Sequence, residues 1–204
     1  MDITLFPTKG NLILAKNTLR LSRQGYELLD KKRNVLIREM MELIEDAKRI
    51  QTNIDTIFSK AYKALQGANI MLGISNVEQI GFAIPLQRGI EIHFRSVMGV
   101  EIPIVSNNSE DTGFPYGFFR TASSLDMAYK EFANVKTLIL ELAMVENSVY
   151  RLATSINKTQ KRANALKNIM IPRYEQITSN IQNALEEKER EEFSRLKVIK
   201  RNKK

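Results

Sequence analysis

The fold is decided by residues 12–68, which read LILAKNTLRLSRQGYELLDKKRNVLIREMMELIEDAKRIQTNIDTIFSKAYKALQGA. Steps of alternately three and four residues from Leu12 reach positions that are all apolar, except for Ser22 and Arg33. These positions are Leu12, Ala15, Leu19, Ser22, Tyr26, Leu29, Arg33, Leu36, Met40, Leu43, Ala47, Ile50, Ile54, Ile57, Ala61, Ala64 and Ala68. A heptad pattern kept for more than three or four heptads predicts a coiled coil. Because no proline follows Pro7 before Pro85, we expect one helix over residues 8–68, capped by Thr8.

The same spacing returns in the last part of the chain. It runs through Ala128, Glu131, Val135, Leu138, Leu142, Val145, Val149, Leu152, Ile156, Thr159, Ala163, Leu166 and Met170. From Ala163 onward the apolar steps change to an 11-residue repeat, which reduces the left-handed supercoil. We therefore expect a second coiled-coil helix over residues 123–200. Pro172 should bend this helix, because proline lacks an amide donor and crowds the carbonyl of Asn168.

Residues 69–122 differ in composition and hold most of the glycines and three of the five prolines. Ile90, Ile92 and Phe94 alternate with polar residues, which predicts a half-buried strand. A second alternating run follows at residues 100–104, and its Pro103 is typical of an edge strand. We expect a small central domain that contains a β-hairpin over about residues 88–105, with its turn at residues 96–99.

These segments predict a mostly α-helical fold. Two long apolar seams in one chain can pair only as an antiparallel two-helix coiled coil, with the small domain between the helices. If Ala68 lies near Ala128, Leu12 lies near Ala184. The C-terminal helix then extends past the first helix, followed by a basic tail at residues 201–204. A helix that projects beyond its partner requires another surface to cover its apolar residues.

Composition and motifs exclude several classes of function. The 204-residue chain has no cysteine and one histidine, which excludes a disulfide scaffold and a thiolate or histidine-rich metal site. It contains no phosphate-binding glycine motif, no HExxH motif and no nucleophile elbow. We expect no catalytic residue, no cofactor and no metal, and hence a non-catalytic protein.

The helical periodicity fits two functions from different classes. One is a coiled-coil structural adaptor or tether. The other is a basic helical hairpin that binds nucleic acid, given a net charge of +8. However, the basic residues are interspersed with Glu and form no stripe interleaved with aromatic residues, which disfavours nucleic acid.

Four blocks of the sequence resemble a known family. They are PTKGNL at residues 7–12, GYELLDKKRNVLI at 25–37, VMGVEIP at 97–103, and RANALKNIMIPRYEQITSNIQNALEEKEREEFSRLKVIK at 162–200. In this order and at this chain length, they are similar to the D-subunit family, the central rotor shaft of V-type and archaeal-type rotary ATPases.

The resemblance implies a function, partners and a location. Members of that family couple ATP hydrolysis or synthesis to proton or sodium ion transport by rotation. Their paired termini enter a hexamer of catalytic and regulatory subunits, while the other end meets the small F subunit of the stalk and a funnel-shaped subunit above the membrane ring. The chain would then be cytoplasmic and peripheral to the membrane, within the soluble ATPase sector and without membrane insertion.

Two sets of residues are candidates for partner binding. The resemblance brings the termini into the hexamer, where we expect contacts from Lys9, Asn11, Arg190, Phe193, Arg195, Leu196, Lys197 and Lys200. The hairpin should contact another stalk subunit through Glu91, His93, Arg95, Met98 and Glu101.

Overall fold

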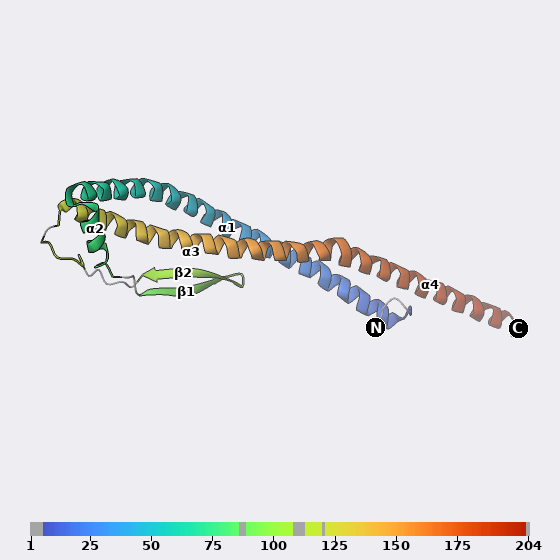
Figure 1. Ribbon diagram of the computed structural model, residues 1–204. Coiled ribbons are helices and arrows are strands. Elements are labelled where there is room, and N and C mark those ends of the chain that lie inside the picture. The colour runs from blue at the N-terminus through green and yellow to red at the C-terminus, as the bar shows by residue number, and fades with distance from the viewer. Residues whose placement is uncertain (1–5, 86–88, 108–112, 120, 203–204) are drawn as a thin grey trace. The chain divides into compact units, whose positions relative to one another are not determined.

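The structure is a computed structural model that describes residues 6–85, 89–107, 113–119 and 121–202. Helices α1 (Lys9–Leu72) and α2 (Ile74–Gly81) precede a hairpin of strands β1 (Ile90–Val97) and β2 (Val100–Asn107), and helix α3 (Ser123–Ala165) follows the hairpin. The chain then continues through the π-helical segment η1 (Leu166–Met170) into α4 (Ile171–Asn202). Figure 1 shows these elements in order along the chain. The predicted fold class, two long helices with a β-hairpin between them in sequence, is confirmed.

Both ends of helix α1 are explained by the residues that flank it. The backbone N–H of Asn11 donates to the hydroxyl oxygen of Thr8 at 3.2 Å, which confirms Thr8 as the capping residue. The helix ends at Leu72 because Gly73 has a φ of 81°, a left-handed conformation that glycine adopts without strain. It is therefore slightly longer than the predicted range of 8–68.

By packing, the chain divides into two compact units, which are Met1–Asn34 with Ile156–Lys204, and Val35–Ser155. The segments expected from the sequence (8–68, 69–122 and 123–200) follow secondary structure instead, and that domain division stays a prediction. Of the candidate residues, the terminal set lies in the first unit and the hairpin set in the second.

The second unit is built on the seam between α1 and α3. Ile50 and Ile54 of α1 and Val145 of α3 form a buried cluster. Seven further apolar side chains pack against it, namely Leu43, Ala47, Phe58, Leu138, Leu142, Met144 and Val149. Burying an aliphatic side chain of this size stabilises a fold by roughly 1.5–3 kcal/mol. All of these residues except Phe58 and Met144 are seam positions predicted from the heptads.

The first unit pairs the start of α1 with the end of the chain. Ala15 and Ser22 of α1 are buried, as are Thr159, Ala163 and Ile181 on the partner helix. Arg23 forms an ion pair with Glu175 at 2.6 Å, and Lys9 forms one with Glu189 at 3.1 Å. These pairs agree with the predicted antiparallel register, in which Leu12 lies near Ala184.

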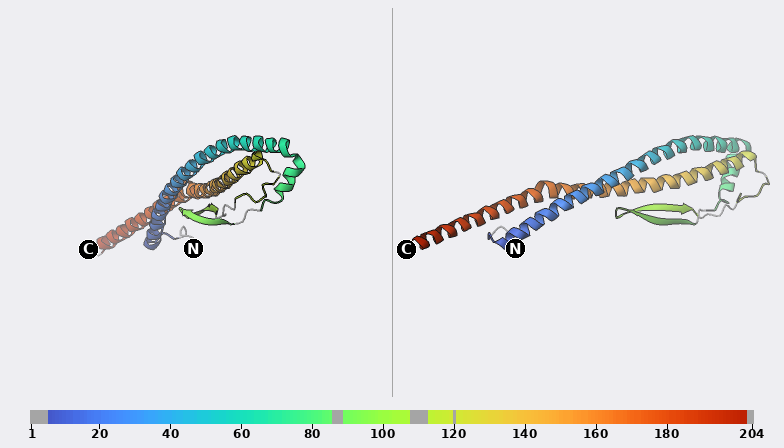
Figure 2. Two further views of the ribbon diagram at one scale, coloured as in Figure 1. Left: turned by 90° about the vertical axis from the view of Figure 1, so that its left-hand side faces the viewer. Right: turned by 180° about the vertical axis from the view of Figure 1, so that it is seen from behind.

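The bend expected at Pro172 takes the form of a π-helical turn just before it. The backbone N–H of Ile171 donates to the carbonyl of Leu166, five residues earlier, so η1 has a wider turn than an α-helix. The wider turn provides room for the proline ring beside the preceding carbonyls, which a regular α-helix would crowd. Figure 2 shows the helix axis changing direction at this segment.

The hairpin is less buried than its pattern predicts. β1 pairs with β2 in antiparallel register, with Phe94 opposite Pro103 and Val97 opposite Val100. The predicted half-buried strand is wrong for most of β1, because Ile90, Ile92 and Phe94 are 42, 58 and 57% exposed. Val97 and Ile102 are buried, and by the strand register they share a face with Arg95 rather than with Phe94. The predicted range also included Arg88, which lies outside the described residues.

Candidate partner-binding surfaces

The end of α4 projects beyond its partner within the first unit. Lys9, at the start of α1, pairs with Glu189, and α4 continues to Asn202. All side chains of residues 190–202 are exposed, including the apolar Phe193, Leu196, Val198 and Ile199. Such apolar residues on a solvent-exposed helix indicate a binding surface for another molecule. We call residues 190–202 the α4 extension.

The predicted terminal residues lie on two elements of this unit. Six of them belong to the α4 extension, namely Arg190, Phe193, Arg195, Leu196, Lys197 and Lys200. Arg190 and Arg195 lie 3.9 Å from Glu186 and Glu191, each one helical turn earlier. Such exposed pairs contribute little to stability, so the charges can be exchanged for those of a partner at small cost.

The two predicted residues of α1 lie at its first turn. Lys9 is held by Glu189, and the side-chain amide of Asn11 donates to the carbonyl of Phe6 at 2.9 Å. The ion pair brings Lys9 next to the beginning of the α4 extension. Asn11 instead contacts the backbone at Phe6, just before α1.

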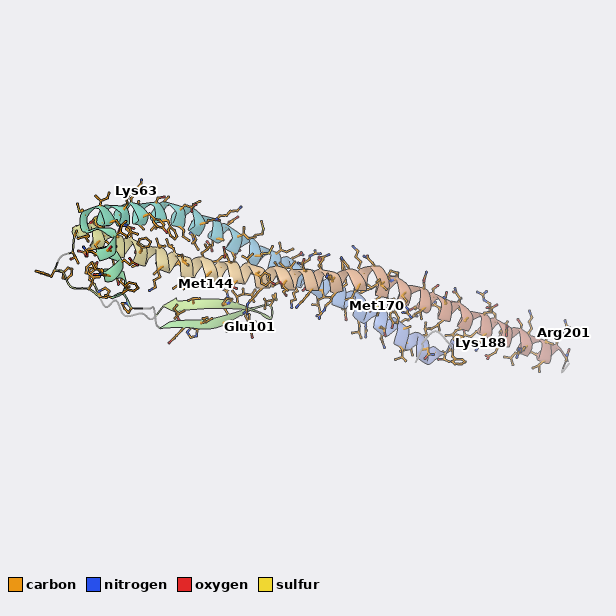
Figure 3. The ribbon with its side chains drawn as sticks, in the orientation of Figure 1. Lys63, Glu101, Met144, Met170, Lys188 and Arg201 are labelled. Atoms are coloured by element: carbon orange, nitrogen blue, oxygen red, sulfur yellow. The ribbon has the colours of Figure 1, made fainter. Side chains whose placement is uncertain are left out.

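The predicted hairpin residues belong to the second unit, where the hairpin lies along α3 (Figure 2). Figure 3 shows Met144 of α3 beside the strand that carries Glu101. The backbone N–H of Val105 lies 3.4 Å from the sulfur of Met144, and Arg151 donates to the carbonyl of Glu101 at 3.2 Å. The guanidinium of Arg151 also lies 5.4 Å from the centre of the Phe94 ring. The hairpin is thus held to α3 by a few polar and cation–π contacts.

The five candidate hairpin residues do not share one role. Arg95 pairs with Glu39 of α1 at 3.6 Å, and His93 Nε2 lies 3.5 Å from Glu91 Oε2 on the same strand. Met98 is exposed in the turn, where it has a φ of 50°. Glu91, His93 and Met98 are therefore available to a partner, whereas Arg95 and Glu101 already contribute to holding the hairpin against the helices.

Sequence reasoning missed an apolar surface in the second unit, which we call the apolar tip. Its exposed side chains come from the end of α1, from α2 with its following turn, and from the loop before α3: Ile70, Met71, Ile74, Phe82 and Phe118. In the same unit, a cavity of about 190 Å³ between α1, α2 and α3 is lined by Leu65, Val77, Ile80, Tyr129, Phe132 and others. The signal was present in the sequence, because residues 68–84 contain a single charged residue, Glu78.

One polar contact fastens the loop at this tip. The hydroxyl of Tyr116 donates to the carboxylate of Asp126 in the first turn of α3 at 2.9 Å. Burial, together with this bond to a carboxylate, raises the pKa of Tyr116 above its ordinary value. The rings of Phe114, Tyr116 and Tyr129 lie 5.7 to 5.9 Å apart between centres. The loop is therefore attached to α3 by aromatic packing and by a neutral phenol.

Comparison with known proteins identifies the family of this chain. The family model for the D subunit of ATP synthase matches residues 11–201. The V-type ATP synthase D subunit of Thermotoga neapolitana is 46% identical over 97% of this chain and 98% of its own length. The chain belongs to the ATP synthase D-subunit family. The A-type ATP synthase D subunits of Methanosphaera stadtmanae and Thermococcus kodakarensis are 35% and 34% identical over 96% and 95% of this chain, and over 93% and 92% of their own lengths.

Membership of the ATP synthase D-subunit family confirms the resemblance found in the four sequence blocks. A subunit of an ATP synthase acts in a complex with other subunits of that enzyme. None of the described helices is both long and apolar enough to span a membrane. Within the described ranges, no three His, Cys, Asp or Glu side chains gather closely enough to hold a metal ion.

Proposed function

We propose that this chain is the central rotor shaft of a V/A-type ATP synthase. In this role it couples ATP hydrolysis or synthesis in a catalytic hexamer to the transport of protons or sodium ions by rotation. The observation that carries the proposal is the α4 extension, a charged helix with exposed apolar residues that continues past its coiled-coil partner. The family to which the chain belongs supports the same assignment. The chain itself then has no catalytic step and no cofactor.

A shaft must resist twisting along its length. The buried seam of the coiled coil provides this stiffness, because interlocked side chains oppose sliding of one helix along the other. It must also present different surfaces around its axis. We assign that asymmetry to η1 and Pro172, which change the direction of the helix in the first unit.

The α4 extension is the surface that we assign to the hexamer, together with Lys9 and Asn11. Its side chains form charge pairs within one helical turn and are exposed. Contacts of this kind are weak and readily exchanged, which suits a surface that must leave one partner for the next. A single strongly buried contact would hold the rotor in one position instead.

The second unit supplies the remaining proposed contacts. The hairpin residues Glu91, His93 and Met98 would face the small F subunit of the stalk. The apolar tip would contact the funnel-shaped subunit, because a surface with so few charges requires an apolar counterpart. The chain would accordingly be cytoplasmic and peripheral to the membrane.

The experiment is purification of the tagged chain from its native cells, followed by mass spectrometry and an ATPase assay of the purified material. We expect two abundant nucleotide-binding subunits, a small stalk subunit and ATP hydrolysis. Recovery of the chain alone, or with nucleic acid or filament proteins, would contradict the proposal and favour a tether or a nucleic-acid-binding protein.

A further inference from the structure

The two edges of the hairpin are not equivalent. On β2, the backbone N–H of Val105 donates to the sulfur of Met144 at 3.4 Å, and the carbonyl of Glu101 accepts from Arg151 at 3.2 Å. These backbone groups therefore point toward α3, and Pro103 between them has no N–H to donate. The edge formed by β2 is thus covered by a helix of the same unit, and Figure 1 shows β2 between β1 and α3.

The opposite edge, formed by β1, has no such cover. Ile92 is opposite Val105, and Ser96 is opposite Glu101. Because hydrogen-bonded and non-hydrogen-bonded pairs alternate in an antiparallel ladder, the backbone groups of Ile92, Phe94 and Ser96 point away from β2. Within the described ranges, the sheet has no third strand, and no other backbone group bonds to this edge. An edge of this kind is a template for pairing with another strand.

The sequence of β1 is complementary to itself when two copies run antiparallel. A two-fold axis at His93 places Glu91 of each copy opposite Arg95 of the other, and it places Ile92 opposite Phe94. The outward-pointing backbone groups of the two strands also meet in this register. An axis at Ile92 or at Phe94 brings those backbone groups together as well, but it no longer places Glu91 opposite Arg95. Charge complementarity therefore selects the axis at His93.

The charged side chains of this strand are free to change partners. His93 lies 3.5 Å from Glu91, and Arg95 lies 3.6 Å from Glu39 of α1. The side chains of Glu91, His93 and Arg95 are all more than half exposed. Exposed ion pairs of this kind contribute little to stability, so a pair between Glu91 and Arg95 of two copies can replace them.

We propose that the free edge of β1 pairs with β1 of a second copy of this chain, in antiparallel register about His93, to form a four-stranded sheet. The pairing belongs to the chain before assembly, because the proposed function assigns Glu91, His93 and Met98 to a stalk subunit. That subunit would take the place of the second copy. Until then, the dimer covers an edge that would otherwise be open to unrelated strands.

The test uses the isolated full-length chain, which has no cysteine. His93→Cys brings two thiols together on the axis, in a non-hydrogen-bonded pair whose Cα atoms lie about 4.5 Å apart. This separation is within the range that a disulfide spans. Mild oxidation followed by a non-reducing gel should show a disulfide-linked dimer.

Glu91→Cys and Arg95→Cys are the matched controls. Both positions are exposed on the same face of the same strand, but in the proposed register each lies roughly 14 Å from its own copy. Each variant alone should therefore cross-link at least ten-fold more slowly than His93→Cys. An equal mixture of the two should cross-link readily, because position 91 of one copy faces position 95 of the other.

Further variants of the His93→Cys chain test the charges and the edge. Glu91→Arg places like charges opposite each other and should slow cross-linking several-fold. Adding Arg95→Glu restores opposite charges with their signs exchanged and should restore the rate. Ile92→Pro removes an outward-pointing N–H without removing a bond between β1 and β2, and it should also slow cross-linking several-fold.

Equal cross-linking rates for the three single cysteine variants would indicate random collision and overturn the inference. The absence of a dimer from His93→Cys would overturn it as well, and so would a charge-exchanged variant that stays as slow as Glu91→Arg. None of these results bears on the rotor proposal, which is tested in the assembled enzyme. Failure of the rotor proposal would leave the self-pairing in place and remove only the stalk subunit as its competitor.

Discussion

At the scale of single residues, Met98 is in a backbone conformation that residues other than glycine rarely adopt. Both Met98 and Gly99 have positive φ values, of 50° and 76°, in the two-residue turn between Val97 and Val100. This geometry is typical of the type I′ turn, for which Asn-Gly is the preferred sequence. The sequence predicted a turn at residues 96–99. It did not predict the positive φ of Met98, because methionine is not a residue that favours a type I′ turn.

We expect Met98→Asn to stabilise the isolated chain by about 0.5–1 kcal/mol, because asparagine tolerates the left-handed region and the exposed methionine loses little packing. Chemical denaturation monitored by circular dichroism measures this change. A loss of stability would show that the methionine side chain contributes packing that outweighs its strain. If Met98 also contacts a stalk subunit, the same variant should bind that subunit more weakly.

At the scale of elements, periodicity predicted the two long helices because each repeats one burial rule many times. Periodicity did not predict α2, because this eight-residue helix has no buried side chain and therefore shows no repeating apolar pattern. It predicted a bend at Pro172, but not the π-helical turn that precedes it. It also assigned the wrong face of β1 to the core, because a two-stranded sheet is held at a few points rather than along a whole face.

We expect Pro172→Ala to let η1 relax toward a regular α-helix and to stabilise the coiled coil, because an interior proline costs a helix about 3 kcal/mol. Amide hydrogen exchange at residues 166–176 should slow. The regular helix would place everything after residue 170 at a different rotation about its axis, so ATP-driven ion transport in the reconstituted enzyme should fall. Slower exchange with unchanged transport would show that the bend is structural only.

Deletion of residues 90–107, joined by a short glycine linker, should leave the helical core intact. The hairpin reaches α1 through the Arg95–Glu39 ion pair and α3 through the contact of Arg151 with Glu101, but the core cluster does not include it. Because we assign the hairpin to a stalk subunit, we expect weaker retention of that subunit and an altered rate of ATP hydrolysis in the assembled enzyme. Wild-type assembly and hydrolysis rates would count against that role.

At the scale of the whole molecule, the proposed function depends on surfaces that the chain leaves uncovered. The α4 extension could be predicted from the unequal lengths of the two seams. The apolar tip could not be assigned to a partner from periodicity alone, because an apolar residue near the end of a seam is taken for part of the core until its exposure is known. Similarity to the ATP synthase D-subunit family identifies the assembly in which we expect those surfaces to be covered.

Truncation after Leu185 tests whether the α4 extension is needed for ion transport but not for folding. It removes the α4 extension and the exposed Lys9–Glu189 ion pair but keeps the buried Ile181. The free energy of unfolding should therefore change by less than about 1 kcal/mol. Ion transport per ATP hydrolysed should fall in the reconstituted enzyme. Unaltered coupling would exclude the extension as the surface that transmits torque.

The central claim, that this chain turns within the hexamer, can be observed directly. The chain has no cysteine, so Lys63→Cys on exposed α1 provides a single site for a bead or gold particle. With the hexamer fixed to a glass surface and ATP supplied, single-molecule imaging should show stepwise rotation of the particle in one direction. A stationary particle on complexes that hydrolyse ATP at the normal rate would contradict the rotor function.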